Sequence, residues 1–574
     1  MLFTILLHCL ALFIIGITAQ HLPITGAKSG INNNVPPYRR DIRELQKDNV
    51  AWSIYIQALI TMQTEFQSNP LSWFQIAGIH GRPYMPYDDV PIAPGGWLYG
   101  YCMHSSALFA TWHRPYLALF EQSLSHYAQK IAIMYPSVSR APYVDAAQNL
   151  RMPYWDWASD PRMPDFLNTA QVIITTPTGV QNVNNPLASY KFQGLQMNTT
   201  MFPSSSGASR GDYFLAGAER TIRNPDVMGG LPNIQAANDK LANQRLKELT
   251  YLVLTSAPDW NTFATSGTRG ISVEAIHNIL HSVVGGQYGH FLALSYSAFD
   301  PIFWLHHTNV DRLAALYQAV HPDSWVVPTT ESYGTFAVIP GSVSNENTSL
   351  SPFSTDVQGD LWTSRMSRPI SVFGYSYPEI QYWNQTPQQL AASVSSSINY
   401  LYGPSNPSRK RASGSRRMQT TWNAATSVNK LAAGGGAFFV RFFLGAIPAD
   451  AETWATDAAN VGSFAVLATP MQFADQISIS TTYFELSLSS ALRERGIDGQ
   501  DIGGTTKYLE DNLQWRIQLV NETVLDNVEA KDLSVSVHEI TISLGRQNSE
   551  LPNYSNNKMH LSITNGKLGG AVQC

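Results

Sequence analysis

The sequence predicts a mainly α-helical domain followed by a smaller β-rich domain. In the first part of the chain, apolar and aromatic residues recur at helical spacing in three segments: residues 50–66, 236–254 and 271–283. In the last part, three short runs of β-branched, aromatic and alternating residues are typical of strands: residues 437–444, 480–488 and 533–544. A basic stretch of small residues lies between the two patterns. We therefore expect a helical domain over 20–400, an exposed linker over 401–417 and a β-rich domain over 418–574.

Between these segments the helical domain is expected to contain long loops. Gly and Pro punctuate residues 79–84, which predicts a loop. A helix is expected to start at His113 and to run through Glu121, with Pro115 in its first turn, where proline is tolerated. Residues 165–235 and 322–370 are rich in Asn, Pro, Ser and Thr and are also expected to be loops.

The composition is typical of a large globular protein and excludes several classes. The chain has 574 residues, of which 14% are charged and 11% aromatic, so it can bury a large core. The net charge is −5, and no basic run is long enough to indicate a nucleic-acid partner. Apart from the N-terminus, no segment is long and apolar enough to cross a bilayer.

The N-terminal residues 1–19 resemble a secretory signal peptide. They are apolar and end in Thr-Ala, which predicts cleavage after Ala19 and a secreted protein without membrane contact. The alternative is a membrane anchor, but the stretch is short for a span. Removal of the signal would remove Cys9 and leave two cysteines, too few for a disulfide framework. Five glycosylation sequons fit secretion; they begin at Asn198, Asn347, Asn384, Asn521 and Asn553.

Histidines cluster in two parts of the helical domain. His277 and His281 are four residues apart, so a helix places both imidazoles on one face. His306 and His307 follow in an apolar and aromatic stretch, residues 297–312. Converging neutral imidazoles form a metal site that suits copper, zinc, iron or nickel.

A second group of histidines lies upstream. His80 falls in the loop 79–84, His104 in a further loop, and His113 at the expected helix start. Six histidines therefore sort into two sets of three, which indicates a binuclear centre. Ligation by imidazole alone, without thiolate or carboxylate, favours copper, although zinc remains possible.

Three motifs make residues 40–377 resemble the type-3 copper family, which includes tyrosinases, catechol oxidases and, more distantly, hemocyanins. They are Trp112-His-Arg-Pro-Tyr-Leu117, His277-Asn-Ile-Leu-His281 and Phe299-Asp-Pro-Ile-Phe-Trp-Leu-His-His-Thr-Asn-Val-Asp-Arg312. The resemblance, closest to secreted fungal tyrosinase proenzymes, implies a helical-bundle domain that holds two copper ions. It assigns one copper to His80, His104 and His113. It assigns the other to His277, His281 and His307.

The resemblance also assigns roles to residues beside the ligands. Cys102 is expected to form a thioether with His104, the alternative being a reduced buried cysteine. Phe109 and Phe303 are expected to pack over the two metal positions, or to be ordinary core aromatics.

Two further residues are expected to act on the substrate. Glu274 and Asn278 are expected to hold a water that takes the phenol proton, and so to act catalytically. The alternative is a solvated helix-face glutamate and a capping asparagine.

The remaining histidines match no ligand position. We expect His306 to pack or to hydrogen-bond behind the ligands. The others are expected to be structural or on the surface: His126, His290, His321, His538 and His560. Asp300 and Asp311 could orient ligand imidazoles. Arg39 or Arg40 is expected to pair with Tyr375 and Tyr377, whose Tyr-x-Tyr resembles the motif that closes the family's catalytic domain.

The implied reaction is oxidation of small phenols by O2. The leading interpretation is a tyrosinase that hydroxylates monophenols and oxidises o-diphenols to o-quinones, as in pigment formation. The alternatives are a catechol or o-aminophenol oxidase without hydroxylation, and an oxygen carrier of the hemocyanin type. A homo-oligomer is compatible with the sequence.

The resemblance further implies that the C-terminal domain, a β-sandwich or barrel, covers the copper site. The enzyme would then be latent until a protease cuts between about Arg409 and Arg417. Phe464 is a candidate for the side chain that plugs the entrance; its simpler role is that of a β-domain core residue.

Overall fold

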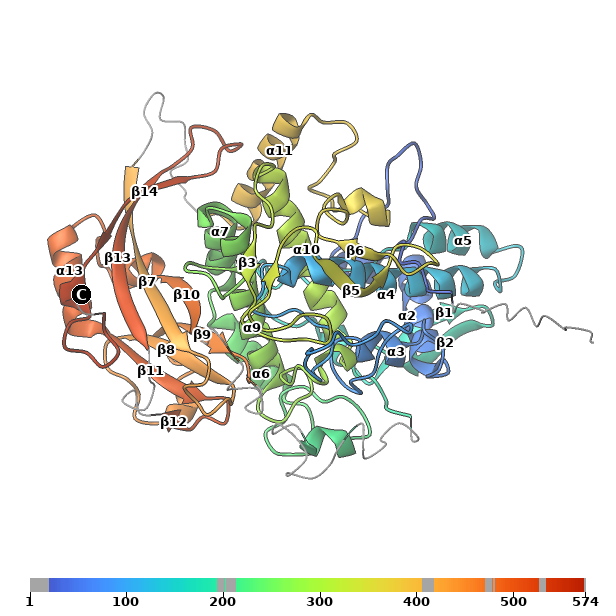
Figure 1. Ribbon diagram of the computed structural model, residues 1–574, viewed down its shortest axis with the longest axis horizontal. Coiled ribbons are helices and arrows are strands. Elements are labelled where there is room, and N and C mark those ends of the chain that lie inside the picture. The colour runs from blue at the N-terminus through green and yellow to red at the C-terminus, as the bar shows by residue number, and fades with distance from the viewer. Residues whose placement is uncertain are drawn as a thin grey trace, which may run out of the picture.

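The computed structural model describes residues 20–193, 202, 213–404, 418–469, 477, 481–525 and 533–571. Four predicted features lie outside these residues: the signal peptide at 1–19, the linker residues 405–417, the sequon at Asn198, and Cys574. The described chain forms a helical domain and a sheet domain that lie side by side (Figure 1). Within it, no helix combines the length and apolar character needed to traverse a membrane.

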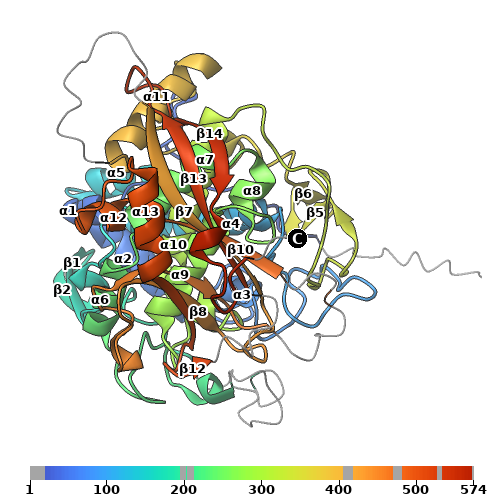
Figure 2. The same ribbon diagram turned by 90° about the vertical axis from the view of Figure 1, so that its left-hand side faces the viewer.

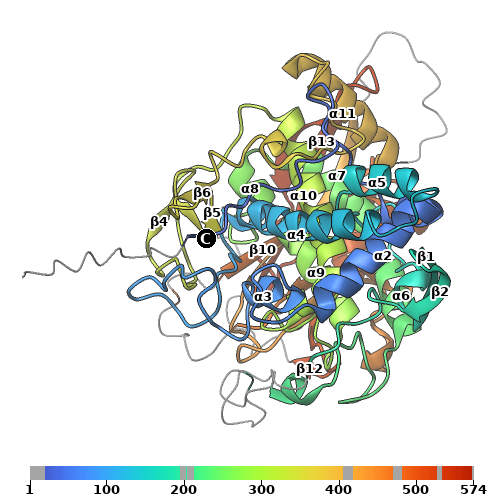
Figure 3. The same ribbon diagram turned by 90° about the vertical axis from the view of Figure 1, so that its right-hand side faces the viewer.

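Eleven α-helices build the helical domain within the described residues. They are α1 (Ile42–Lys47), α2 (Asn49–Thr64), α3 (Trp73–Gly78), α4 (Phe109–Ala132), α5 (Arg140–Asn149), α6 (Ile234–Ala242), α7 (Leu246–Ser256), α8 (Trp260–Ala264), α9 (Val273–Gly285), α10 (Ile302–Val320) and α11 (Pro387–Leu401). Helix α10 packs against α4, α9 and α11, and nearly all side chains of α4 and α10 are buried. Helices α2, α4 and α5 form the face away from the sheet domain (Figure 3).

Short antiparallel strand pairs form in segments of this domain that were expected to be loops. The pairs are β1 (Gln171–Thr176) with β2 (Gly179–Asn184), β3 (Thr329–Thr330) with β4 (Val343–Ser344), and β5 (Ser349–Ser354) with β6 (Leu361–Thr363). Single 3-10 turns occur in both domains: Asp165–Leu167, Tyr213–Gly217, Ser297–Phe299, Ile370–Phe373, Ala451–Thr453 and Leu561–Ile563.

Two helices differ from the expectation. The segment 236–254 forms two helices, α6 and α7, because Arg245 adopts a left-handed conformation between them. Helix α4 begins four residues before His113 and extends beyond Glu121, so Pro115 lies inside the helix rather than in its first turn. Complete burial of residues 109–121 of α4 compensates for the backbone hydrogen bond that proline cannot make.

The C-terminal domain consists of two four-stranded antiparallel sheets, as expected of a β-sandwich (Figure 2). One has the order β10-β7-β13-β14, built from Thr481–Ser487, Met418–Asn429, Ser534–Ser543 and Asn553–Met559. The other has the order β12-β11-β8-β9, built from Val524–Leu525, Leu513–Leu519, Phe438–Leu444 and Asn460–Val466. Helices α12 (Ser489–Glu494) and α13 (Ile502–Asn512) flank the sheets.

Strand β9 is the part of this domain that meets the helical core. All of its side chains are buried, because β9 packs against α9 as well as against β8 and β10. By contrast, β10 alternates buried and half-buried residues, as a strand with one covered face does. The sheet domain therefore lies directly on α9, the helix that carries His277 and His281.

A buried ion-pair network ties the chain's N-terminal segment to α4 and α10. The Asp311 carboxylate accepts hydrogen bonds from Arg39, Arg114, Tyr375 and Tyr377 at 2.6–3.1 Å. Burial alone would raise the pKa of Asp311, but the guanidinium groups of Arg114 and Arg39 hold it below its usual value. The expected pairing of Arg39 with the two tyrosines is confirmed, and Asp311 is its centre.

Replacement of Asp311 by alanine should therefore be strongly destabilising. Asp311→Ala leaves the buried guanidinium of Arg114 without a carboxylate and takes one of two carboxylates from Arg39, which keeps Glu121. The change is expected to lower the free energy of unfolding by about 3–5 kcal/mol. Urea unfolding measures the change. The matched variant Asp511→Ala, which breaks an exposed pair with Lys507, should cost less than about 1 kcal/mol. Equal losses in both variants would contradict the central role of Asp311.

Candidate metal centre

Helix α9 presents two imidazoles from one face, as the spacing predicts. Ser272 caps the helix by accepting from the Ala275 amide, and His277 and His281 lie one turn apart. The Nδ1–H of His281 donates to the Phe291 carbonyl at 2.6 Å, and that of His277 donates to Asn278 Oδ1 at 2.9 Å. Since these oxygens can only accept, both Nε2 atoms carry free lone pairs.

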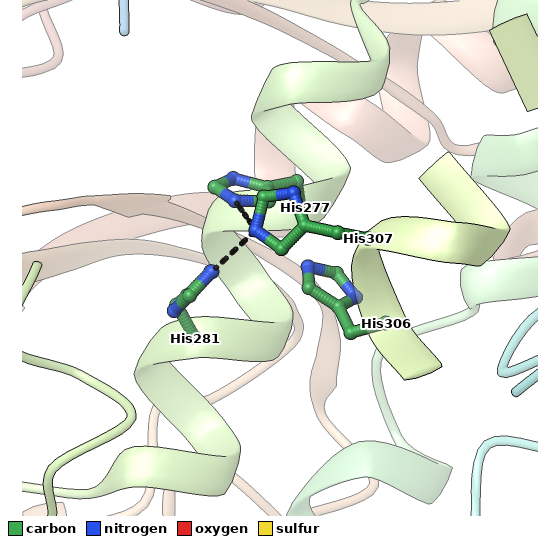
Figure 4. A group of neighbouring side chains, drawn as sticks. All are labelled: His277, His281, His306 and His307. Atoms are coloured by element: carbon green, nitrogen blue, oxygen red, sulfur yellow. Dashed lines mark hydrogen bonds between the residues drawn. The ribbon is translucent and has the colours of Figure 1, made fainter. Parts of the chain in front are cut away.

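Helix α10 brings a third imidazole to this pair. The Nε2 of His307 lies 3.2 Å from Nε2 of His277 and 3.4 Å from Nε2 of His281 (Figure 4). Two nitrogens bound to one tetrahedral metal at about 2.0 Å each lie about 3.3 Å apart. The three nitrogens therefore have the spacing of ligands around one ion.

The second trio comes from three separate segments. His80 follows α3, His104 lies in the loop before α4, and His113 lies in the second turn of α4. The ring centroids are 5.5–6.0 Å apart. His80 Nδ1 donates to the Leu294 carbonyl at 3.0 Å and His113 Nδ1 to the Phe109 carbonyl at 2.8 Å. The Nε2 of His80 is buried and has no hydrogen-bond partner among the described residues.

The two trios meet at the middle of the domain. The rings of His113 and His307 stack with centroids 4.3 Å apart. Phe109 lies 4.9 Å from both His113 and His277, and Phe303 stacks on His307 at 4.0 Å and lies 5.0 Å from His80. Each phenylalanine therefore contacts histidines of both trios rather than covering one.

All six imidazoles are neutral at neutral pH. Burial lowers the pKa of His80 to about 4 and that of His281 to about 3. Burial and the neighbouring imidazoles hold the pKa well below its usual value in the other four: His104, His113, His277 and His307. Neutral imidazole is the form that binds a metal, so the donor set fits two ions.

Cys102 lies against the second trio. Its Sγ is 3.3 Å from Nδ1 and 3.9 Å from Nε2 of His104, beside the edge of that ring, and 3.5 Å from Nε2 of His113. Burial raises the pKa of the thiol. The position suits the expected thioether with His104, which stays a prediction. The approach of the sulfur to His113 was not foreseen, because the two residues are eleven apart across a loop.

His306 packs behind the α9 pair. Its ring stacks on His277 with centroids 5.0 Å apart, and neither ring nitrogen has a hydrogen-bond partner within the described chain. Packing, the first of the two expected roles, is the one that the structure shows. Of the other histidines, His126 is exposed and His290 is buried against the Ile222 amide. In the sheet domain, His538 bonds to Asn557 and His560 to Glu539.

Glu274 is buried and accepts four hydrogen bonds from the protein. The Ser105 amide donates to Oε1 at 2.5 Å. The Thr265 hydroxyl, the Ser266 amide and the Ser266 hydroxyl donate to Oε2 at 2.8–3.0 Å. The alternative prediction, that Glu274 is a solvated residue on the helix face, is therefore wrong. The loop residues 105, 265 and 266 were missed, since no local pattern links them to α9.

A cavity of about 50 Å³ lies beside His104, Glu274 and Asn278. Both domains line it: the sheet domain contributes Lys430, Thr482 and residues 466–469, which comprise the last residue of β9 and the three that follow it. Lys430 is buried, which lowers its pKa to about 8, and its ammonium lies 4.5 Å from the ring centre of Tyr333. The C-terminal domain thus forms one side of the cavity.

Phe464, the candidate plug, lies elsewhere. It is fully buried in β9 and stacks on Phe484 of β10 with ring centroids 4.9 Å apart. It is not among the described residues that line the cavity. Phe464 thus packs as a core residue, its simpler role, and the plug assignment stays a prediction without support from the cavity lining.

Two three-imidazole clusters that meet through the stacked rings of His113 and His307 define a binuclear copper centre of the type-3 class. Comparisons agree. A model of the common central domain of tyrosinase matches residues 70–320, and a model of the tyrosinase C-terminal domain matches residues 421–537. The chain belongs to the tyrosinase family.

Individual relatives cover most of the chain. The tyrosinase of Podospora anserina is 35% identical over 67% of this chain and 70% of its own length. The tyrosinase of Neurospora crassa is 35% identical over 65% of this chain, which spans only 56% of that relative. The structure of recombinant mushroom tyrosinase is 27% identical with a TM-score of 0.81, and covers 94% of this chain and 98% of its own. An octopus hemocyanin (Enteroctopus dofleini) is only 24% identical.

Loss of one ligand should remove one copper ion. His307→Ala or His113→Ala is expected to leave about one copper per chain instead of two, because each trio holds one ion. Atomic absorption on the purified variants measures the content. His126→Ala, which changes an exposed histidine, should keep both ions. Full copper content in His307→Ala would show that this imidazole is not a ligand.

Proposed function

We propose that the protein is a secreted phenol oxidase that hydroxylates monophenols at the ortho position and oxidises o-diphenols to o-quinones with O2. The observation that carries the proposal is the meeting of six neutral imidazoles, five of them buried. In four of them an Nδ1–H hydrogen bond leaves the Nε2 lone pair free. The relatives named tyrosinase support the same activity. His80, His104 and His113 hold one copper, and His277, His281 and His307 hold the other. The bound copper pair supplies the redox chemistry with O2.

The protein's own groups prepare the phenol. Phe109 and Phe303 give the centre apolar walls that exclude water. A phenol must lose its proton before its oxygen can bind a metal, and Glu274, at the cavity wall, is the carboxylate placed to accept that proton through a water. Asn278 holds the ring of His277 by its Oδ1 and faces the same cavity. A thioether from Cys102 would fix His104, which lies in a loop.

The intact chain is proposed to be latent. A cavity of about 50 Å³ is too small for a phenol, since benzene binds in an engineered cavity of about 150 Å³. The walls contributed by the C-terminal domain must move or leave before the substrate can enter. A protease that cuts within 405–417, where Arg and Lys are concentrated, would release the domain.

Two other functions remain candidates. A catechol or o-aminophenol oxidase would use the same centre but would not hydroxylate monophenols. A hemocyanin-like oxygen carrier would oxidise neither class of phenol; the low identity to hemocyanin disfavours it. Oxygen uptake with tyrosine and with catechol separates the three.

Cleavage of the linker should activate the enzyme. Limited trypsin treatment of the copper-loaded chain is expected to raise the rate of catechol oxidation at least tenfold, because the cleaved domain can then dissociate and uncover the cavity. The matched control replaces the basic residues of 405–417 with serine and should stay latent under the same treatment. An intact chain that oxidises catechol as fast as the cleaved chain would refute latency.

Glu274→Gln should impair the step that needs proton removal. In the cleaved enzyme, tyrosine hydroxylation is expected to fall about 100-fold, since a positioned base contributes at least that much. The matched control is Glu331→Gln, which changes a buried carboxylate bonded to Ser106 and Ser344 outside the cavity lining of the described chain. Copper content should be unchanged in both variants. A tyrosine rate within threefold of the wild type in Glu274→Gln would exclude Glu274 as the base.

A further inference from the structure

The Glu274 carboxylate accepts hydrogen bonds from two loops, and the C-terminal domain forms hydrogen bonds to both loops. A carboxylate offers about four acceptor positions, and four protein donors occupy them: the Ser105 amide, the Thr265 hydroxyl, and the amide and hydroxyl of Ser266. A proton acceptor in this state has little capacity left for a water. What keeps these donors in place therefore decides whether Glu274 can act.

Strand β10 fixes the first loop. It is the edge strand of its sheet, so its free backbone N–H groups can bond outside the sheet. The Tyr483 amide donates to the Ser266 carbonyl at 2.8 Å, and the Thr482 hydroxyl donates to the same carbonyl at 3.2 Å. Both Ser266 and Thr482 are buried. One residue, Ser266, thus joins the sheet domain to Glu274.

Lys430 fixes the second loop. It lies just beyond the end of β7, and its ammonium donates to the Ser105 hydroxyl. Ser105 follows His104 and adopts a positive φ of 54°, so its backbone conformation needs such support. Its amide is the donor to Oε1 of Glu274. The sheet domain therefore holds both serines whose amides bind the carboxylate.

We propose that the C-terminal domain, besides covering the cavity, keeps the proton acceptor from binding a water. Through Ser266 and Ser105 it keeps Glu274 hydrogen-bonded to protein donors. Ser266 is a positioning residue in this arrangement. Departure of the domain removes the bonds to the Ser266 carbonyl and the Ser105 hydroxyl, so both loops relax and Glu274 becomes free to hold a water. This inference rests on the proposed role of Glu274 as the base.

Hydrogen exchange of the intact, copper-loaded chain tests the connection. Thr482→Val keeps the side-chain shape but removes the hydroxyl that bonds to Ser266. We expect exchange of the Ser105 amide, read by mass spectrometry on peptides that contain it, to accelerate roughly fivefold, the change expected for one lost hydrogen bond. Thr482 and Ser105 share no hydrogen bond in the described structure, whereas Thr482 bonds to Ser266 and both serines bond to Glu274, so a change at Ser105 reports transmission through Ser266 and Glu274.

Two controls make the result decisive. Thr482→Ser retains the hydroxyl and should behave as the wild type. Thr255→Val removes a different hydrogen bond between the domains, the one that joins the Thr255 and Tyr554 hydroxyls at 2.8 Å, and should leave Ser105 exchange within twofold of the wild type. Unchanged exchange in Thr482→Val, or an equal change in Thr255→Val, would overturn the proposal. Neither outcome depends on activity, so failure here is distinct from failure of Glu274→Gln to impair hydroxylation.

Discussion

The direction of the imidazole lone pairs is the constraint on which the centre depends. In His80, His113 and His281 the Nδ1–H donates to a backbone carbonyl, and in His277 it donates to the neighbouring asparagine. These acceptors belong to the folded backbone or the same helix, so the fold itself sets each tautomer before any metal arrives. One short segment orients histidines of both trios, because the Phe291 carbonyl binds His281 and the Leu294 carbonyl binds His80. The two metal positions are therefore coupled through a single stretch of backbone after α9.

The C-terminal domain acts on this centre through the same helix. Strand β9 covers α9 with buried side chains, while β10 reaches the loop before it. Polar contacts join the domains in several places, among them the ion pair of Arg245 with Glu494. Those of Lys430 and Thr482 lie at the cavity. A cut outside the interface breaks none of these contacts by itself. Cleavage changes only the effective concentration of the domain, so dissociation is a separate step after it.

The sequence predicted the parts of this structure that depend on local pattern. The change from helical to strand periodicity was sufficient to predict a helical and a β-rich domain. The spacing of His277 and His281 and the stretch around His307 were sufficient to predict that these histidines lie together. Features that depend on contacts between distant residues were not accessible. One partner of Glu274 is Ser105, which lies 169 residues away in the sequence. Helix α4 continues past Pro115 because tertiary packing buries that part of the helix. Phe464 shows the same limit, since an aromatic residue in a strand gives no sign of which face it occupies.

The core treats its charged and its neutral polar groups in opposite ways. Asp311 and Glu274 each accept four hydrogen bonds at buried positions, because an unpaired carboxylate in the core would be very costly. The Nε2 of His80, by contrast, is left without a partner in the described structure. An unsatisfied buried nitrogen costs about 1–3 kcal/mol, which the fold can tolerate where the metal restores the missing bond. Metal binding then adds stability in proportion to its affinity. Full pairing of the Asp311 and Glu274 carboxylates therefore fixes the scaffold, and incomplete pairing of a neutral imidazole leaves the centre ready for copper.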